Sequence, residues 1–116
     1  MSEPVISVGE KLHIMTRRLF EADIRRHFAG EVTAVAADLI EVTGYTFIFN
    51  AGTTNYVKLP ELRTRVFSPG QAGLIVNKIP RDVVVSNLDY RHINRRLTFT
   101  DGKSFALDVN EFGASA

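Results

Sequence analysis

The chain has 116 residues, of which 45% are hydrophobic and 23% charged, and its formal net charge at pH 7 is +1. These values are typical of one globular domain spanning 1–116, and they exclude intrinsic disorder and a strong overall field for nucleic acid or acidic membranes. The chain lacks cysteine, a secretory signal and any apolar run near ~18 residues, so we expect a cytoplasmic protein without disulfides, thiolate metal sites or membrane contact.

The first quarter of the chain fits two periodicities. Residues 1–8, like the tail 113–116, are expected to be loose ends. Phe20, Ile24 and Phe28 recur at helical spacing, whereas every second residue from Ile24 onward fits a strand. We favour a strand near 11–18, a turn or short helical segment at 21–23 and a strand from about Arg25. A single N-terminal helix is the alternative, so 17–29 is left open between helix and strand.

The middle of the chain reads as strands. Runs of β-branched and aromatic residues predict strands over 31–35 and 39–49, joined by a small turn. Gly44 interrupts the second run and predicts a bulge or sharp bend there. A loop follows at 50–55.

Shorter strands are expected in the second half. They cover 56–59 and 63–67, and the apolar runs 74–76 and 83–85 are expected to be buried strands. The dipeptide Pro69-Gly70 predicts a turn between the strands 63–67 and 74–76.

A hairpin is expected near the C-terminus, around Asp101-Gly102. A three-residue loop would pair Leu97 with Phe105 and place the large apolar side chains on one face, where they can be buried together. This register requires a left-handed residue at Gly102.

These elements predict a mainly β fold. Closely spaced strands leave no room for helical crossovers, so we expect a small, strongly bent antiparallel barrel with an extra N-terminal strand or short helix. Four glycines are expected to have structural roles: Gly30, Gly44, Gly70 and Gly102.

No pattern in the sequence indicates catalysis. The three histidines, His13, His27 and His92, lie far apart along the chain and predict separate residues rather than a metal site. No serine motif marks a nucleophile, and no pair among the thirteen acidic residues stands out. We therefore expect no catalytic, cofactor-binding or metal-binding residues and lean against an enzyme, without excluding one.

Arginine makes up ten of the fourteen basic residues and occurs largely in pairs. Its planar guanidinium suits phosphates and carboxylates, so intramolecular ion pairs compete with partner contacts as the explanation. The segments that interleave arginines with rings predict candidate contacts to nucleic acid or a partner. They comprise Arg17, Arg18, Arg25, Arg26, His27, Tyr90, Arg91, Arg95 and Arg96.

The stretch 28–44 resembles the first signature of Sm-like proteins. Gly30, Val32, Val35 and Leu39 match its glycine and apolar positions, and Gly44 fits the glycine of its bent second strand. The resemblance implies a strongly bent five-stranded barrel that assembles into rings. It also implies RNA as a partner, because many members of that family bind single-stranded RNA.

The sequence also departs from that family. Ala36 and Ile40 occupy the positions of its RNA-contacting Asp and Asn, and its second signature is absent, with Thr100-Asp101-Gly102 as the nearest glycine turn. Loss of these polar groups weakens the expectation of RNA binding.

The function expected from the sequence is a non-enzymatic barrel that binds and self-associates as a homo-oligomer. Binding of RNA or single-stranded nucleic acid through the arginine pairs is the alternative. A small enzyme with an Asp/Glu/His site is the second alternative.

Overall fold

The computed structural model describes residues 5–16, 25–70 and 73–109 as two antiparallel β-sheets. The large sheet has the order β4-β3-β2-β1-β6. β5 also pairs with β3, at residues 40–44, whereas β4 pairs with it at 47–50. The strands of the large sheet are β1 (Lys11–Thr16), β2 (Arg26–Ala36), β3 (Leu39–Asn50), β4 (Asn55–Lys58), β5 (Arg63–Phe67) and β6 (Leu74–Ile79).

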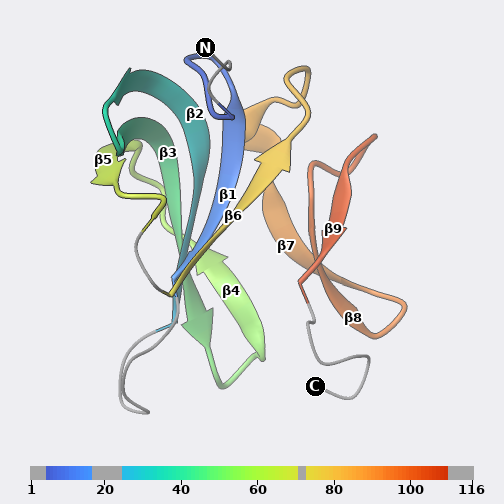
Figure 1. Cartoon of the computed structure of the whole chain (residues 1–116). Helices are drawn as coiled ribbons and strands as arrows, with labels where there is room; N and C mark the ends of the chain where they lie inside the picture. Colours follow the sequence, from blue (N-terminus) through green and yellow to red (C-terminus); the bar gives the residue numbers. More distant parts are fainter. Residues whose placement is uncertain (1–4, 17–24, 71–72, 110–116) are drawn as a thin grey trace.

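The small sheet has the order β7-β8-β9 and lies beside the large one (Figure 1). Its strands are β7 (Asp89–Ile93), β8 (Arg96–Thr100) and β9 (Ala106–Asp108). The 3₁₀ turn η1 (Val85–Asn87) lies in the connection that leads from β6 to β7.

The strands of the large sheet are apolar on both faces. Alternation along β1 sends Leu12 and Ile14 to what we call the inner face and His13 to the outer face, and all three are fully buried. On β2, Phe28 faces inward, while His27 and Ala29 face outward. β2, β3 and β6 therefore contribute apolar residues to two separate clusters, and β1 adds His13 to the second of them.

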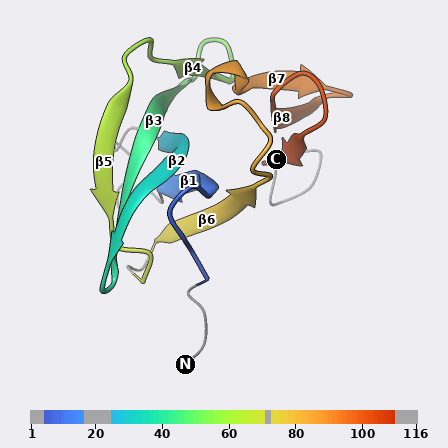
Figure 2. The ribbon, with the colours of Figure 1, turned by 90° about the horizontal axis from the view of Figure 1, so that it is seen from above.

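The inner face carries a wholly apolar cluster. Its buried members are Leu12, Ile14, Phe28, Val32, Ile40 and Val42. Phe67 of β5 and Leu74 and Val76 of β6, from opposite ends of the sheet, pack against this one cluster. The sheet therefore curls, as Figure 2 shows from above. Among the described residues β5 and β6 form no hydrogen-bonded pair, so the curl is open there.

Two glycines allow β2 and β3 to approach closely. The register shift of this strand pair lies between Val32 and Ala34, so the bulge expected at Gly44 is not found there. Gly30 and Gly44 are directly opposite each other in the register. A Cβ added at Gly44 would lie 1.9 Å from the carbonyl oxygen of Ala29, and one at Gly30 would lie 2.3 Å from that of Thr43. Neither position has room for a side chain, because backbone atoms occupy the space.

The outer face packs against the small sheet through aromatic residues. Phe47 meets Tyr90 and Phe99 edge to face, with ring centroids 5.2 and 5.4 Å apart. Tyr56 of β4 stacks on Tyr90 at 4.5 Å. This inter-sheet cluster also buries Ala29, Ile79, Val83 and Leu88.

The structure resolves the helix-or-strand question for the residues it describes. Residues 11–16 and 26–29 are strands, so the single N-terminal helix is wrong. The segment 17–24, which includes the expected turn at 21–23, lies outside the described residues. Within the part of the chain that is described, no helix is long and apolar enough to cross a membrane.

Two expected elements differ in the second half. The run Val83–Val85 is not a strand: Val83 is buried, Val84 is exposed and Val85 begins η1. The strand β7 was not expected, because Asp89, Arg91 and His92 obscure its apolar signal.

The C-terminal hairpin forms in a different register. Phe99 pairs with Leu107, and the three-residue loop is wrong because the loop spans 101–105. The Asp101 carboxylate accepts the backbone N–H groups of Lys103, Ser104 and Phe105 and so holds a wider loop. Gly102 does adopt the left-handed conformation, with φ +78°.

Three further expectations concern the turn at Gly70 and the two ends of the chain. Gly70 lies in a turn where an added Cβ would contact nothing within 4 Å, so no close approach requires glycine there. Ile6 packs against the inner cluster, and the Ser7 N–H donates to Glu10, so part of the expected loose end 1–8 is anchored. Residues 113–116 lie outside the described residues.

Candidate functional site

Four buried polar rings form the most unusual feature of the outer face. The pairing of β1 with β2 sets His13 opposite Ala29 and Met15 opposite His27, so the two imidazoles become diagonal neighbours. Their centroids are 5.3 Å apart. Tyr56 from β4 and Tyr90 from β7 complete the group, which we call the His–Tyr network.

Hydrogen bonds run through this network in one direction. The Asn77 amide nitrogen lies 3.3 Å from His13 Nδ1 and 3.7 Å from the Met15 sulfur, so Nδ1 is an acceptor. His13 Nε2–H then donates to the Tyr90 hydroxyl at 2.6 Å.

The Tyr90 hydroxyl has one proton, and it donates that proton to His27 Nδ1. His27 Nε2–H in turn donates to the Tyr56 hydroxyl at 3.2 Å. Each imidazole is therefore neutral and protonated on Nε2, which satisfies every ring nitrogen with a single proton per ring.

Burial keeps the network uncharged. His13 is 0% exposed and His27 5%. Desolvation, with a smaller contribution from His27, lowers the pKa of His13 to about 3. Desolvation and the nearby Arg25 charge lower the pKa of His27 to about 4. Burial raises the pKa of Tyr90 well above its ordinary value, with smaller contributions from Tyr56 and Asp89.

The prediction of three separate histidines is therefore wrong for two of them. His13 and His27 share one network, whereas His92 is exposed and its Nε2 lies 3.1 Å from the carbonyl oxygen of Thr54. Tyr56 and Asn77 were missed altogether. No sequence spacing could have identified them, because the network draws on β1, β2, β4, β6 and β7.

The structure separates the expected contact residues into three groups. Arg17 and Arg18 lie outside the described residues. His27 and Tyr90 are buried in the network and cannot meet a partner from solvent. The other five lie on two different sheets: Arg25 and Arg26 precede or begin β2, and Arg91, Arg95 and Arg96 lie in the β7–β8 hairpin.

These five arginines differ in their surroundings. Arg25 lies over the Phe49 ring, 5.1 Å from its centroid. Arg96 pairs with Asp108 across the small sheet. In the portion of the chain that is described, Arg26, Arg91 and Arg95 are exposed and form no ion pair.

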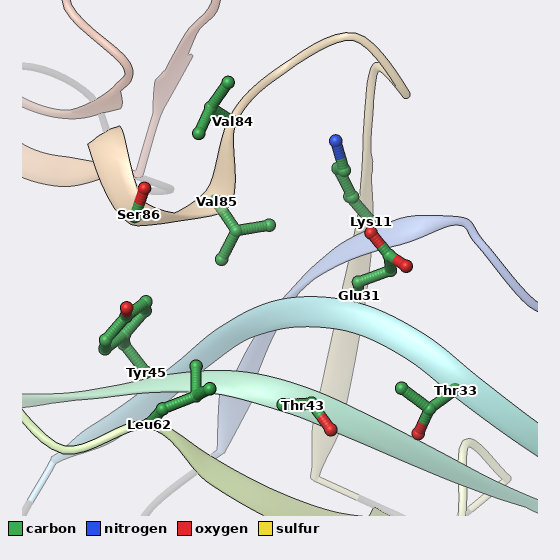
Figure 3. Close-up of a pocket in the computed structure, with 9 residues that line it drawn as sticks. All are labelled: Lys11, Glu31, Thr33, Thr43, Tyr45, Leu62, Val84, Val85 and Ser86. Atoms are coloured by element: carbon green, nitrogen blue, oxygen red, sulfur yellow. The ribbon is translucent and has the colours of Figure 1, made fainter.

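A shallow groove lies on the same outer face, between the large sheet and the connection that contains η1 (Figure 3). Its volume is about 440 Å³. It is lined by Lys11, Glu31, Thr33, Thr43, Tyr45, Leu62, Val84, Val85 and Ser86.

Two lysines hold one wall of this groove in place. Lys11 Nζ donates to the carbonyl oxygens of Arg81, at 2.6 Å, and Val83. Lys58 Nζ donates to those of Ser86 and Leu88, at 2.7 and 3.0 Å, and partial burial lowers its pKa. The connection 80–88 is thereby clasped to the large sheet at two points.

The groove and the His–Tyr network are separate features of the outer face. None of the four network rings lines the groove, and Glu31 is its one carboxylate. Among the described residues, no three histidine, aspartate or glutamate side chains are grouped to bind a metal ion. The network holds its rings in neutral form, and the groove is a separate surface feature.

Comparisons with protein-family models, curated proteins and solved structures found no match to this chain.

Proposed function

We propose that the chain is a non-enzymatic binding module that self-associates through the open edges of its curled sheet. The observation that carries this proposal is β5. This strand pairs only with β3 among the described strands, and its first four residues, 63–66, are all exposed. Val66, an apolar residue of this strand, is 62% exposed. Unpaired edge strands of this kind are ready templates for pairing with another chain.

The opposite end of the sheet supplies a second edge. In the described structure β6 pairs only with β1, and Ile75 on it is 42% exposed. Pairing β5 of one copy with β6 of another would continue the sheet and satisfy both edges in a repeated head-to-tail contact. Such contacts close into a ring when the rotation allows.

The Sm-like barrel remains part of this proposal. The curl around one apolar cluster and the close approach of Gly30 to Gly44 support barrel-like geometry. The row β6-β1-β2-β3-β5 supplies five strands for it.

Light scattering on the purified chain tests self-association. We expect a mass that is a multiple of 12.9 kDa, and a fall toward 12.9 kDa for Val66→Lys, because a charge on an edge strand opposes pairing. Val57→Lys is the matched control, since Val57 is an exposed valine on β4. A monomeric wild-type chain at high concentration would contradict the proposal.

Nucleic-acid binding is a second candidate, favoured by one observation. The two-residue turn at Asn94-Arg95 has φ +51° and +65°, a turn type in which glycine is preferred at the second position. Arg95 is exposed and forms no ion pair with any described residue. An arginine in a left-handed conformation is strained by about 1 kcal/mol, and such strain concentrates at functional positions.

Arg95→Gly separates the two effects of this residue. We expect the variant to be at least as stable as wild type but to bind a single-stranded oligonucleotide more weakly at ~50 mM salt. Arg63→Ala, which removes an exposed arginine that pairs with Glu61, is the control. Equal binding by wild type and Arg95→Gly, or no binding by wild type, removes this candidate.

A further inference from the structure

Among the described residues, few side-chain hydrogen bonds join the two sheets. Tyr90 of β7 contacts both His13 and His27, and His92 contacts the Thr54 carbonyl. Apolar and aromatic side chains of the inter-sheet cluster pack around them. The Lys11 and Lys58 clasps hold the connection 80–88, which precedes β7, rather than the small sheet itself.

A second proton on either imidazole requires the network to rearrange. A proton on His13 Nδ1 would point at the Asn77 amide nitrogen, which is itself a donor, so the amide would have to turn over and leave the Met15 sulfur. A proton on His27 Nδ1 would displace the Tyr90 hydroxyl proton from its acceptor. Two charged rings would also lie 5.3 Å apart in an apolar interior.

Among the described residues, the titratable groups in contact with the two imidazoles are each other, Tyr56 and Tyr90, from β1, β2, β4 and β7. The Asp89 carboxylate acts on Tyr90 and is not among the causes that shift either imidazole. Phe99 of β8 and Asn77 of β6 complete the contacts of His13. Arg25 adds positive charge near His27, and within the described residues no carboxylate contacts either ring.

From this arrangement we propose that the His–Tyr network is an acid-sensitive joint whose protonation releases the small sheet from the outer face of the large sheet. The inner cluster contains no titratable side chain, so the large sheet keeps its curl when the joint opens. The clasped connection 80–88 then serves as the tether, and the ring faces of Phe47, Phe49 and Tyr56 become accessible. This inference does not depend on the proposed self-association.

Hydrogen exchange resolved by segment tests the joint. After correction for the intrinsic rate at each pH, we expect the opening equilibrium of β7 and β8 to rise about 1000-fold between pH 7.5 and pH 5, the effect of two histidines that titrate only when exposed. Residues 28–32 of β2, with their partners in β3, change much less. Equal loss of protection in both sheets, or no pH-dependent change, would overturn the proposal.

A substitution at His27 tests how many histidines contribute to the pH dependence. His27→Gln keeps a hydrogen-bonding side chain that does not titrate, so the increase should fall to about 30-fold, the effect of one histidine. His92→Gln, at the exposed histidine, should keep the full wild-type increase. An unchanged increase in His27→Gln would also overturn the joint. If that variant does not fold, the segment pattern of the wild-type chain decides the matter.

Discussion

The two apolar clusters of this chain share central strands of the large sheet but respond differently to their surroundings. On β1, Leu12 and Ile14 enter the inner cluster, and His13 between them enters the inter-sheet cluster. The members of the inner cluster are apolar and do not titrate, and the buried Thr46 hydroxyl opposite Phe28 does not ionise, so the stability of this region depends mainly on area and packing. The inter-sheet cluster encloses two neutral imidazoles whose burial is favourable only while they bind no extra proton. Alternation along one strand therefore separates a pH-independent region from a pH-dependent one.

The largest expected effect is acid weakening of the inter-sheet cluster. Unfolded histidines bind protons near pH 6.5, whereas His13 and His27 in the fold do so only near 3 and 4. Their contribution is present in full above about pH 6.5 and is lost as the pH falls toward 4, by about 4 kcal/mol between pH 7.5 and pH 5.

Circular dichroism during urea unfolding measures this effect. The chain has three tyrosines and no tryptophan, and all three tyrosines pack in the inter-sheet cluster, so they dominate its near-ultraviolet signal. That signal should be lost at much lower urea at pH 5 than at pH 7.5, while the far-ultraviolet signal of the large sheet shifts less. Coincident shifts of both signals would show that the two clusters are not separable.

The inner region should be destabilised most by a substitution that separates the backbones of β2 and β3. Gly44→Ala places a methyl group against the Ala29 carbonyl and should destabilise the chain by about 3 kcal/mol or more. Urea unfolding at pH 7.5 measures the loss. Gly70→Ala is the control, since its Cβ meets nothing, and it should leave the unfolding free energy within about 0.5 kcal/mol of wild type. A stable Gly44→Ala chain would contradict the close approach of β2 and β3.

Removing one hydroxyl should weaken the inter-sheet region without changing its shape. Tyr90→Phe leaves His13 Nε2–H without its acceptor and His27 Nδ1 without its donor, which should cost about 2 kcal/mol at pH 7.5. Tyr45→Phe in the same cluster is the matched control and should cost less than about 0.5 kcal/mol. Equal stabilities of the two variants would argue against the hydrogen-bonded network.

The smallest expected effect is a gain in the large sheet. The Thr46 hydroxyl is buried opposite Phe28 and has no hydrogen-bond partner in the described structure. Thr46→Val should raise the unfolding free energy by about 1 kcal/mol. Thr98→Val should lower it, because the Thr98 hydroxyl donates to the Arg96 carbonyl. The two variants shifting in the same direction would contradict this assignment.

Local sequence patterns predicted most strands, because alternation and turn residues act over a few positions. Gly102 was correctly expected to be left-handed, yet the register of its hairpin was not, since the Asp101 carboxylate widens the loop. β7 was missed because its charged residues face outward while Tyr90 alone is deeply buried.

The His–Tyr network lay beyond sequence reasoning for a different reason. It depends on the register of β1 against β2 and on the docking of β7 across the sheet, and neither leaves a spacing in the chain. The arginine pairs, in contrast, were conspicuous in the sequence: among the described ones, Arg25 precedes β2 of the large sheet and Arg95 lies in the β7–β8 turn of the small sheet.

The most direct test of the contrast between the two clusters is an NMR titration of the histidine rings in the wild-type chain. From pH 7.5 to 5.5, the folded-state signals of His13 and His27 should remain those of neutral rings protonated on Nε2, without the shift of an imidazole that titrates near 6.5. Titration of either ring near 6.5 within the folded state, or a proton on Nδ1, would contradict the buried, one-directional network.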